Sequence, residues 1–153
     1  MTLFDPDPTT ERAVPPGVGA LPLVVVSFDG GSRGNPGPAA IGAVVSDGDG
    51  RVLATVSERI GVATNNVAEY RALIAGLQAA RAFPAQRLLV RGDSMLVVQQ
   101  VAGAWKVKQP HLRPLVAEAR ALVDEWDDRE LTHVRREQNT DADLLVNAAL
   151  DAG

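Results

Sequence analysis

The chain has 153 residues, no cysteine and a formal net charge of −4, with 46% hydrophobic and 22% charged residues. This length suits one domain with a single core, and the lack of cysteine excludes disulfides and thiolate metal sites. An acidic chain is also a poor candidate for a protein that coats nucleic acid through bulk electrostatics, because phosphate contacts need lysine and arginine.

The N-terminal stretch differs in composition from the rest. Residues 1–20 are rich in proline, aspartate, threonine and glycine and show neither helix nor strand periodicity, which predicts a disordered tail before one domain over residues 21–153. The longest apolar run, Leu21–Phe28, is shorter than the roughly 20 residues of a membrane-spanning helix. The tail also lacks the basic start of a signal peptide. We therefore expect a cytoplasmic protein with no membrane association, most simply a monomer.

Three strands are predicted in the first part of the domain. The run Leu23–Asp29 is rich in β-branched residues and apolar on both faces, which is typical of a central strand. A glycine-rich loop, Gly30–Gly37, leads to a second strand over Ala40–Ser46. The Asp-Gly signal at 47–50 then predicts a tight turn into a third, more exposed strand over Arg51–Ile60. Short loops between the strands predict an antiparallel meander.

The second part of the domain alternates helices with strands. Apolar residues at helical spacing predict a first helix over Asn65–Phe83, which Pro84 ends. The remaining elements expected are strands over 87–91 and 131–135 and helices over 94–102, 110–127 and 139–150. Helical crossovers should make the last two strands parallel to the first. The chain is therefore predicted to be α/β, with a five-stranded mixed sheet (three antiparallel strands, then two parallel) flanked by helices.

Four acidic residues fall where such a fold places functional groups. Asp29 closes the first strand and Asp93 directly follows the fourth, and sites in open sheets form at the carboxyl ends of parallel strands. Glu69 lies in the first turns of its helix, whose positive end favours an ionised carboxylate. Asp143 lies in the first turn of the last helix, although Asp141 in the same turn is a close competitor.

Four carboxylates brought together would repel one another and raise one another's pKa values, so the cluster makes sense mainly with bound cations. Mg²⁺ prefers oxygen ligands and usually keeps several waters. Two such ions about 4 Å apart can activate a water and stabilise the leaving oxygen of a phosphodiester. We therefore predict a site for two Mg²⁺ ions, with Mn²⁺ as a substitute.

Four sequence blocks resemble, in order, the four catalytic blocks of type 1 ribonuclease H. These blocks are Phe28–Gly37, Thr64–Glu69, Asp93-Ser94 and Asn139–Asp143, and the resemblance spans about Leu23 to Leu150. It implies a ribonuclease H-like fold and endonucleolytic, two-metal hydrolysis of the RNA strand in RNA–DNA hybrids, leaving 5′-phosphate and 3′-hydroxyl ends. The metal ligands that it implies are Asp29, Glu69, Asp93 and Asp143.

The resemblance also implies a set of substrate contacts. Residues matching family positions near the RNA backbone and its 2′-hydroxyls are Gly30, Gly31, Ser32, Asn35, Asn65, Asn66 and Ser94. Thr64 matches a position that contacts a DNA phosphate. The 2′-hydroxyl is both donor and acceptor, and it is the group by which a protein distinguishes RNA from DNA.

The chain departs from the family pattern in two places. Members with a basic protrusion carry a Lys/Arg-rich helix and loop after the third block, whereas this chain has only the short Trp105–Lys108 segment. It resembles the short bacterial and archaeal form, so affinity for hybrids should be modest. The residue that assists product release is a histidine in much of the family. Here the candidates are His133, inside the predicted strand, and Arg136, in the predicted loop. The resemblance to the short form, in which an arginine is found at this place, favours Arg136.

Two other functions remain open from the sequence. The first keeps the fold and the metals but gives the nuclease a different nucleic-acid substrate. The second is a non-catalytic nucleic-acid-binding module, which a retained cluster of mutually repelling acids argues against. The glycine-rich loop lacks the Gly-Lys-Ser/Thr of a Walker loop, and Asp47–Gly50 lacks the rest of a calcium-binding loop.

Overall fold

The computed structural model describes residues 20–152, so residues 1–19 of the predicted tail lie outside the described part of the chain. Five strands and four α-helices occupy that part. In chain order they are β1 (Val24–Ser32), β2 (Gly37–Asp47), β3 (Val52–Ala63), α1 (Asn65–Ala80), β4 (Arg87–Gly92), α2 (Met95–Ala102), α3 (Arg113–Val123), β5 (Asp128–His133) and α4 (Thr140–Asp151). Short 3₁₀ turns precede α3 and α4, at Pro110–Leu112 and Arg136–Gln138.

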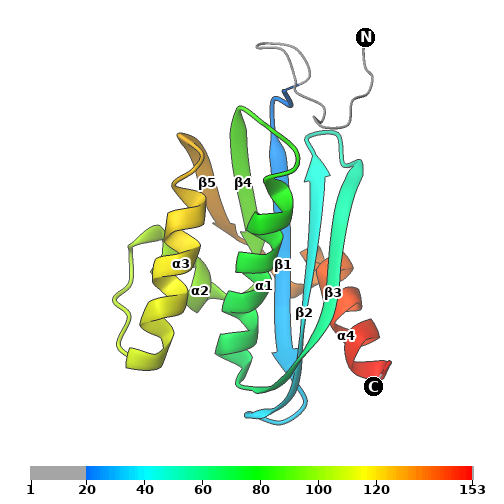
Figure 1. Ribbon diagram of the computed structural model, residues 1–153, viewed down its shortest axis with the longest axis vertical. Coiled ribbons are helices and arrows are strands. Elements are labelled where there is room, and N and C mark those ends of the chain that lie inside the picture. The colour runs from blue at the N-terminus through cyan, green and yellow to red at the C-terminus, as the bar shows by residue number, and fades with distance from the viewer. Residues whose placement is uncertain (1–19, 153) are drawn as a thin grey trace.

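The strands form one mixed sheet in the order β3-β2-β1-β4-β5. The first three strands are antiparallel, while β4 is parallel to β1 and β5 is parallel to β4. The predicted fold class, with its meander and its two parallel strands, is confirmed. In Figure 1, β1 runs through the centre of the sheet, with the hairpin on one side and the parallel strands on the other.

Helices cover both faces of the sheet, as the alternation along β2 shows. A Cβ added to Gly42 would lie 2.5 Å from the carbonyl oxygen of Ala142 in α4, whereas the methyl group of the next residue, Ala43, faces Gly76 of α1. Successive residues of a strand point to opposite faces, so α4 and α1 lie on opposite sides. Figure 1 shows α1 and α3 together in front of the sheet and α4 behind β2 and β3.

The main core lies between the sheet and α1. Val24, Val26 and Phe28 of β1 are fully buried there, as are Leu73 and Leu77 of α1. Burying one such side chain stabilises the fold by about 1.5–3 kcal/mol. The helix begins where Thr64 caps it, because the Thr64 hydroxyl accepts a hydrogen bond of 3.2 Å from the Val67 N–H. This packing fixes α1, and with it Glu69, against β1.

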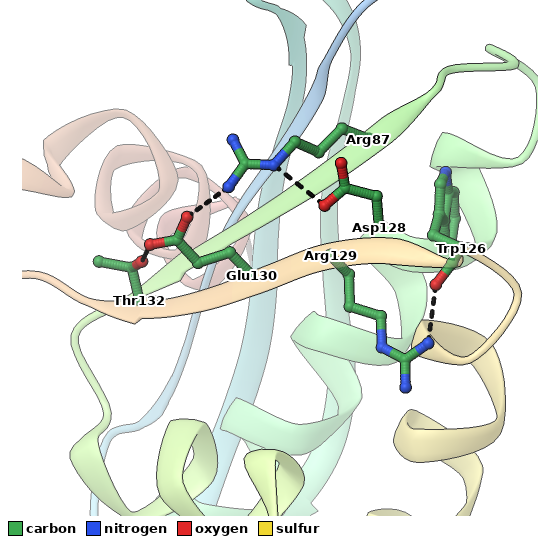
Figure 2. A network of polar contacts seen from close by, with 6 residues as sticks. All are labelled: Arg87, Trp126, Asp128, Arg129, Glu130 and Thr132. Atoms are coloured by element: carbon green, nitrogen blue, oxygen red, sulfur yellow. Dashed lines mark hydrogen bonds and ion pairs between the residues drawn. The ribbon is translucent and has the colours of Figure 1, made fainter.

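The edge strand β5 pairs with β4, and charged side chains on its exposed face form a network across the two strands (Figure 2). Arg87 pairs with Asp128 at 3.3 Å and with Glu130 at 2.7 Å, and the Thr132 hydroxyl donates to Glu130. Exposed pairs of this kind contribute roughly 0–1 kcal/mol each, so they add little to the backbone ladder between β4 and β5. The register aligns His133 with Gly92, which brings the end of β5 beside Asp93.

Several predicted element boundaries are wrong by a few residues. β1 does not end at Asp29 but continues through two glycines to Ser32, which pairs with Ala39 of β2. The loop expected over Gly30–Gly37 is correspondingly shorter. Glycine has a low propensity for strands, but here the pairing of Gly30 and Gly31 with β2 outweighs that propensity.

The ends of the helices and of the last strand also differ from expectation. The first helix stops at Ala80 instead of Phe83, and the helix expected over 110–127 begins as a 3₁₀ turn and stops at Val123. β5 consequently starts at Asp128, three residues before the predicted Leu131. It was misplaced because the exposed face of an edge strand carries charged residues and therefore shows little apolar pattern. Among the described residues, no helix has the length and apolar character needed to cross a membrane.

Candidate active site

The site forms where β1 and β4 separate. Their parallel pairing ends at Phe28 and Gly92, and an aspartate comes next in the chain after each, Asp29 within β1 and Asp93 directly after β4. Asp29 is only 4% exposed and lies opposite Gly42 of β2, so its side chain is on the face covered by α4. The predicted neighbourhood of the two acids is therefore present, although Asp29 lies within its strand.

Glu69 reaches this point because α1 approaches β1 very closely. The Gly30 N–H donates a hydrogen bond of 3.1 Å to Glu69 Oε1. A Cβ on Gly30 would lie 2.2 Å from the carbonyl oxygen of Ala68, a distance that no side chain can occupy. Glycine at this position is thus a packing requirement, and it lets one backbone N–H orient an acidic side chain.

Asp143 comes from the first turn of α4, on the other face of the sheet. Asn139 occupies the N-cap position of α4, yet its side chain does not cap the helix. It is 3% exposed, and its Nδ2 donates a hydrogen bond of 2.9 Å to the carbonyl oxygen of Phe28. This bond ties the start of α4 to the residue before Asp29. Asp143 consequently lines the pocket, whereas Asp141, its competitor in the same turn, is exposed.

The acids lie close enough to share ions. Carboxylate oxygens of Asp29, Glu69 and Asp93 lie within 4.8 Å of one another. Burial, followed by the neighbouring Asp93 and Asp143 carboxylates, raises the pKa of Asp29 to about 8. Burial also raises the pKa of Glu69 well above its ordinary value and raises that of Asp93. These shifts measure how unfavourable the ionised cluster is when no cation balances it.

The residues fit a hard divalent cation. Within residues 20–152, none of the four carboxylates takes part in an ion pair within 4.0 Å. The positive charge of Arg136 lowers the pKa values of Asp29, Glu69 and Asp93, but it is one cation against several acids. The donors are all carboxylate oxygens, which suit Mg²⁺ or Mn²⁺ and do not suit metals that require nitrogen or sulfur ligands.

An open pocket of about 340 Å³ surrounds three of the acids. Its lining comes from β1, the β1–β2 loop, the start of α1, the 3₁₀ turn before α4, and α4 itself: Asp29, Gly30, Gly31, Ser32, Arg33, Asn65, Glu69, Arg136, Asp143, Val146, Asn147 and Leu150. Arg136, the favoured product-release residue, is among them. His133 ends β5 and acts electrostatically on Asp93, but it does not line the pocket.

A polar network joins the β1–β2 loop to α1 beside the acids. Asn65 Oδ1 accepts hydrogen bonds from the Ser32 N–H at 2.9 Å and from the Ser32 hydroxyl at 3.1 Å. The Asn65 N–H in turn donates to Asn35 Oδ1 at 3.0 Å. The predicted contacts Gly30, Gly31, Ser32 and Asn65 thus line the pocket, and Asn35 holds the network from outside it.

Three other predicted contacts have a different position. Thr64 and Ser94 are the N-caps of α1 and α2, and their hydroxyls accept from the N–H groups three residues later. Asn66 is half-buried in the first turn of α1 and does not line the pocket. Thr64 and Asn66 lie at the start of α1, the helix that carries Glu69, and Ser94 directly follows Asp93 at the start of α2.

The sequence predictions missed part of this pocket. Val146, Asn147 and Leu150 of α4 line it at the i+3, i+4 and i+7 positions from Asp143, so helical spacing from that acid would have found them. The long-range bond from Asn139 to Phe28 of β1 has no local signal in the sequence. Arg33, which was not among the predicted site residues, also lines the pocket.

The comparisons agree with this geometry. The family model described as "Reverse transcriptase-like" matches residues 27–149. A ribonuclease HI of Halobacterium salinarum is 52% identical over 124 residues, and a bifunctional protein of Mycobacterium tuberculosis is 52% identical over 130 residues. The crystal structure of the Halobacterium salinarum RNase H1 superposes with a TM-score of 0.82 at 50% identity, covering 86% of this chain and 99% of that one.

A second solved structure is a complex. LC11-RNase H1 with an RNA/DNA hybrid matches with a TM-score of 0.79 at 41% identity, over 84% of this chain and 97% of that one. The matched region is 81% of this chain and 62% of the Halobacterium salinarum relative, and 84% of this chain and 36% of the Mycobacterium tuberculosis one. The chain therefore spans less than two thirds of the length of these two relatives.

Proposed function

The chain belongs to the ribonuclease H family, and on that basis we propose that it hydrolyses the RNA strand of RNA–DNA hybrids in a metal-dependent reaction. The observation that carries this proposal is the carboxylate cluster: oxygens of Asp29, Glu69 and Asp93 lie within 4.8 Å of one another, and Asp143 joins Asp29 and Glu69 in lining one open pocket. A relative that is 41% identical has been crystallised with an RNA/DNA hybrid, which supports the choice of substrate.

We propose that the four carboxylates hold two Mg²⁺ ions, with Mn²⁺ as a substitute. When bound, such ions supply activation of the attacking water and stabilisation of the leaving 3′-oxygen, giving 5′-phosphate and 3′-hydroxyl ends. The work of the chain is to hold the carboxylates close together and oriented, so that cations bound there would favour their ionised form. Gly30 orients Glu69 through its N–H, and Asn139 ties the helix that carries Asp143 to β1.

Substrate recognition is proposed for the polar network of the β1–β2 loop and α1. Gly31, Ser32 and Asn65 line the pocket and offer backbone, hydroxyl and amide groups next to the acids. Groups of this kind suit the 2′-hydroxyl, which donates and accepts hydrogen bonds and is absent from DNA. Arg136 is proposed to assist departure of the cleaved 5′-phosphate, since it brings positive charge to the same pocket.

A substrate panel tests the proposal. The protein is incubated with labelled RNA–DNA hybrid, duplex DNA and duplex RNA, each with Mg²⁺, with Mn²⁺ and with chelator. We expect cutting of the RNA strand of the hybrid alone, and only with metal. Cleavage of duplex DNA or duplex RNA instead would assign a different substrate, and binding without cleavage under either metal would favour a non-catalytic module. A cytoplasmic location and a monomeric state stay predictions.

A further inference from the structure

Arg33 occupies a fixed position at the rim of the pocket. Its N–H donates a hydrogen bond of 2.8 Å to the carbonyl oxygen of Pro38, which closes the β1–β2 loop. A Cβ on Gly37 would lie 2.3 Å from the Arg33 carbonyl oxygen, so the loop backbone is packed too closely here for any residue but glycine at position 37. The backbone is therefore held, while the side chain is 52% exposed.

Charge distinguishes Arg33 from the rest of the pocket. Only Arg33 and Arg136 among the described lining residues are cations. Arg136 acts on Asp29, Glu69 and Asp93, so its charge is engaged by the acids. A polyanionic strand entering a pocket lined with carboxylates needs a positive group at the entrance, and Arg33 is the lining residue placed to supply it.

The guanidinium of Arg33 already has an anionic partner. Its Nη2 lies 2.6 Å from Oδ1 of Asp151, in the last turn of α4, and the Asp151 side chain is 68% exposed. A carboxylate at the negative end of a helix is unfavourable without a nearby cation. Exposed ion pairs contribute little net stability, so this pair can open readily when a stronger ligand for the guanidinium arrives.

We propose that Arg33 binds a phosphate of the strand being cut, next to the scissile linkage, and that Asp151 holds the guanidinium at the rim until that phosphate displaces it. The inference rests on the proposed function and adds a contact to it. Guanidinium groups bind phosphate through two parallel hydrogen bonds, which the single short contact with Asp151 does not match. Asp151 is thus a competitor that sets how strongly the free pocket attracts nucleic acid.

The test measures binding without cleavage. Asp93→Asn serves as the background, and anisotropy of a fluorescent RNA–DNA hybrid is titrated at several salt concentrations. Adding Arg33→Ala should weaken binding about three- to tenfold and reduce the slope of log affinity against log salt by about 0.9, the value for one lost phosphate contact. Arg33→Lys should keep most of the slope, because the charge remains.

The competitor is tested by a double-variant cycle in the same background. Asp151→Asn should strengthen binding about two- to threefold, and this gain should vanish when Arg33→Ala is also present. Arg51, exposed in the turn at the opposite end of β2, supplies the matched control. Arg51→Ala should leave affinity and slope unchanged.

Two results would overturn the inference: an unchanged slope in Arg33→Ala, or an Asp151→Asn gain that persists without Arg33. The second would mean that Asp151 acts only as bulk negative charge. The unsubstituted chain is assayed beside the variants. If the unsubstituted chain neither binds nor cuts the hybrid, the proposed function is wrong, and so is the inference that rests on it. If the unsubstituted chain does both, but adding Arg33→Ala to Asp93→Asn changes neither the affinity nor the salt slope, only the inference about Arg33 is wrong.

Discussion

Replacing Asp29 by asparagine should stabilise the metal-free protein while it destroys the site. Asp29 is 4% exposed, and burial together with the Asp93 and Asp143 carboxylates raises its pKa from 3.8 to about 8. Between these two values the folded chain holds a proton that the unfolded chain has lost. Unfolding therefore releases a proton, and stability falls as the pH rises from about 4 to about 8.

The size of the effect follows from the shift. At pH 7 the span from 3.8 to 7, at about 1.36 kcal/mol per unit, corresponds to a destabilisation of about 4 kcal/mol. Asparagine removes this term and its amide N–H can donate to Asp143 in place of the protonated carboxyl, but the buried amide brings a second N–H that needs a partner, which costs about 1–3 kcal/mol. The expected net gain for Asp29→Asn is about 1–3 kcal/mol at pH 7 with chelator present.

Urea unfolding at pH 5, 7 and 9 with chelator measures this directly. The unsubstituted protein should lose stability across the series, and Asp29→Asn should lose clearly less. Asp127→Asn, which removes an exposed charge before β5, should follow the unsubstituted protein. The reasoning is refuted if Asp29→Asn is the less stable protein at pH 7 and 9, or if its pH dependence equals that of the control.

The remaining predictions concern packing, anchoring and product release. Gly30→Ala should destabilise the fold by about 3 kcal/mol or more because its Cβ would meet the Ala68 carbonyl oxygen at 2.2 Å. Gly31→Ala, whose Cβ would have its nearest neighbour at 3.8 Å, should be tolerated, and urea midpoints compare the two. Asn139→Ala leaves the Phe28 carbonyl without its bond, so thermal unfolding should show a loss of about 1–3 kcal/mol. Its kcat on hybrids should also fall, and an unchanged kcat would mean that Asn139 does not position Asp143. Arg136→Ala should slow steady-state turnover more than His133→Ala does, since of the two only Arg136 lines the pocket. Equal or reversed effects would contradict the assignment of Arg136 as the product-release residue.

Much of the fold could be read from residue patterns because its signals are local. The alternation in β3, the Asp-Gly turn before it and the helical spacing of α1 each arise within a few residues. The parallel direction of β4 and β5 followed from the helical crossovers. Asp29 and Asp93 were placed together by the rule that strand ends meet at one edge. Boundaries failed where tertiary pairing overrides propensity, as in the glycines that extend β1 to Ser32.

The parts of the site that were not predicted depend on contacts between distant residues. Asn139 bonds to Phe28 across 111 positions, and Arg33 pairs with Asp151 across 118. No periodicity or spacing records such a partner. Residue patterns alone did not separate Asp143 from Asp141, and only the family resemblance favoured Asp143. The separation depends on the rotation of α4, which its packing against Gly42 and the Asn139 anchor fix.

The central claim is that the carboxylate cluster cuts the RNA strand of a hybrid, and single-turnover cleavage of end-labelled hybrid tests it most directly. The unsubstituted chain is compared with Asp93→Asn in Mg²⁺, with equal folding of the two checked by circular dichroism. The account predicts cleavage by the unsubstituted chain, no cleavage with chelator, and a loss of at least about a thousandfold in Asp93→Asn. Cleavage that persists in Asp93→Asn, or that proceeds without divalent metal, would contradict it.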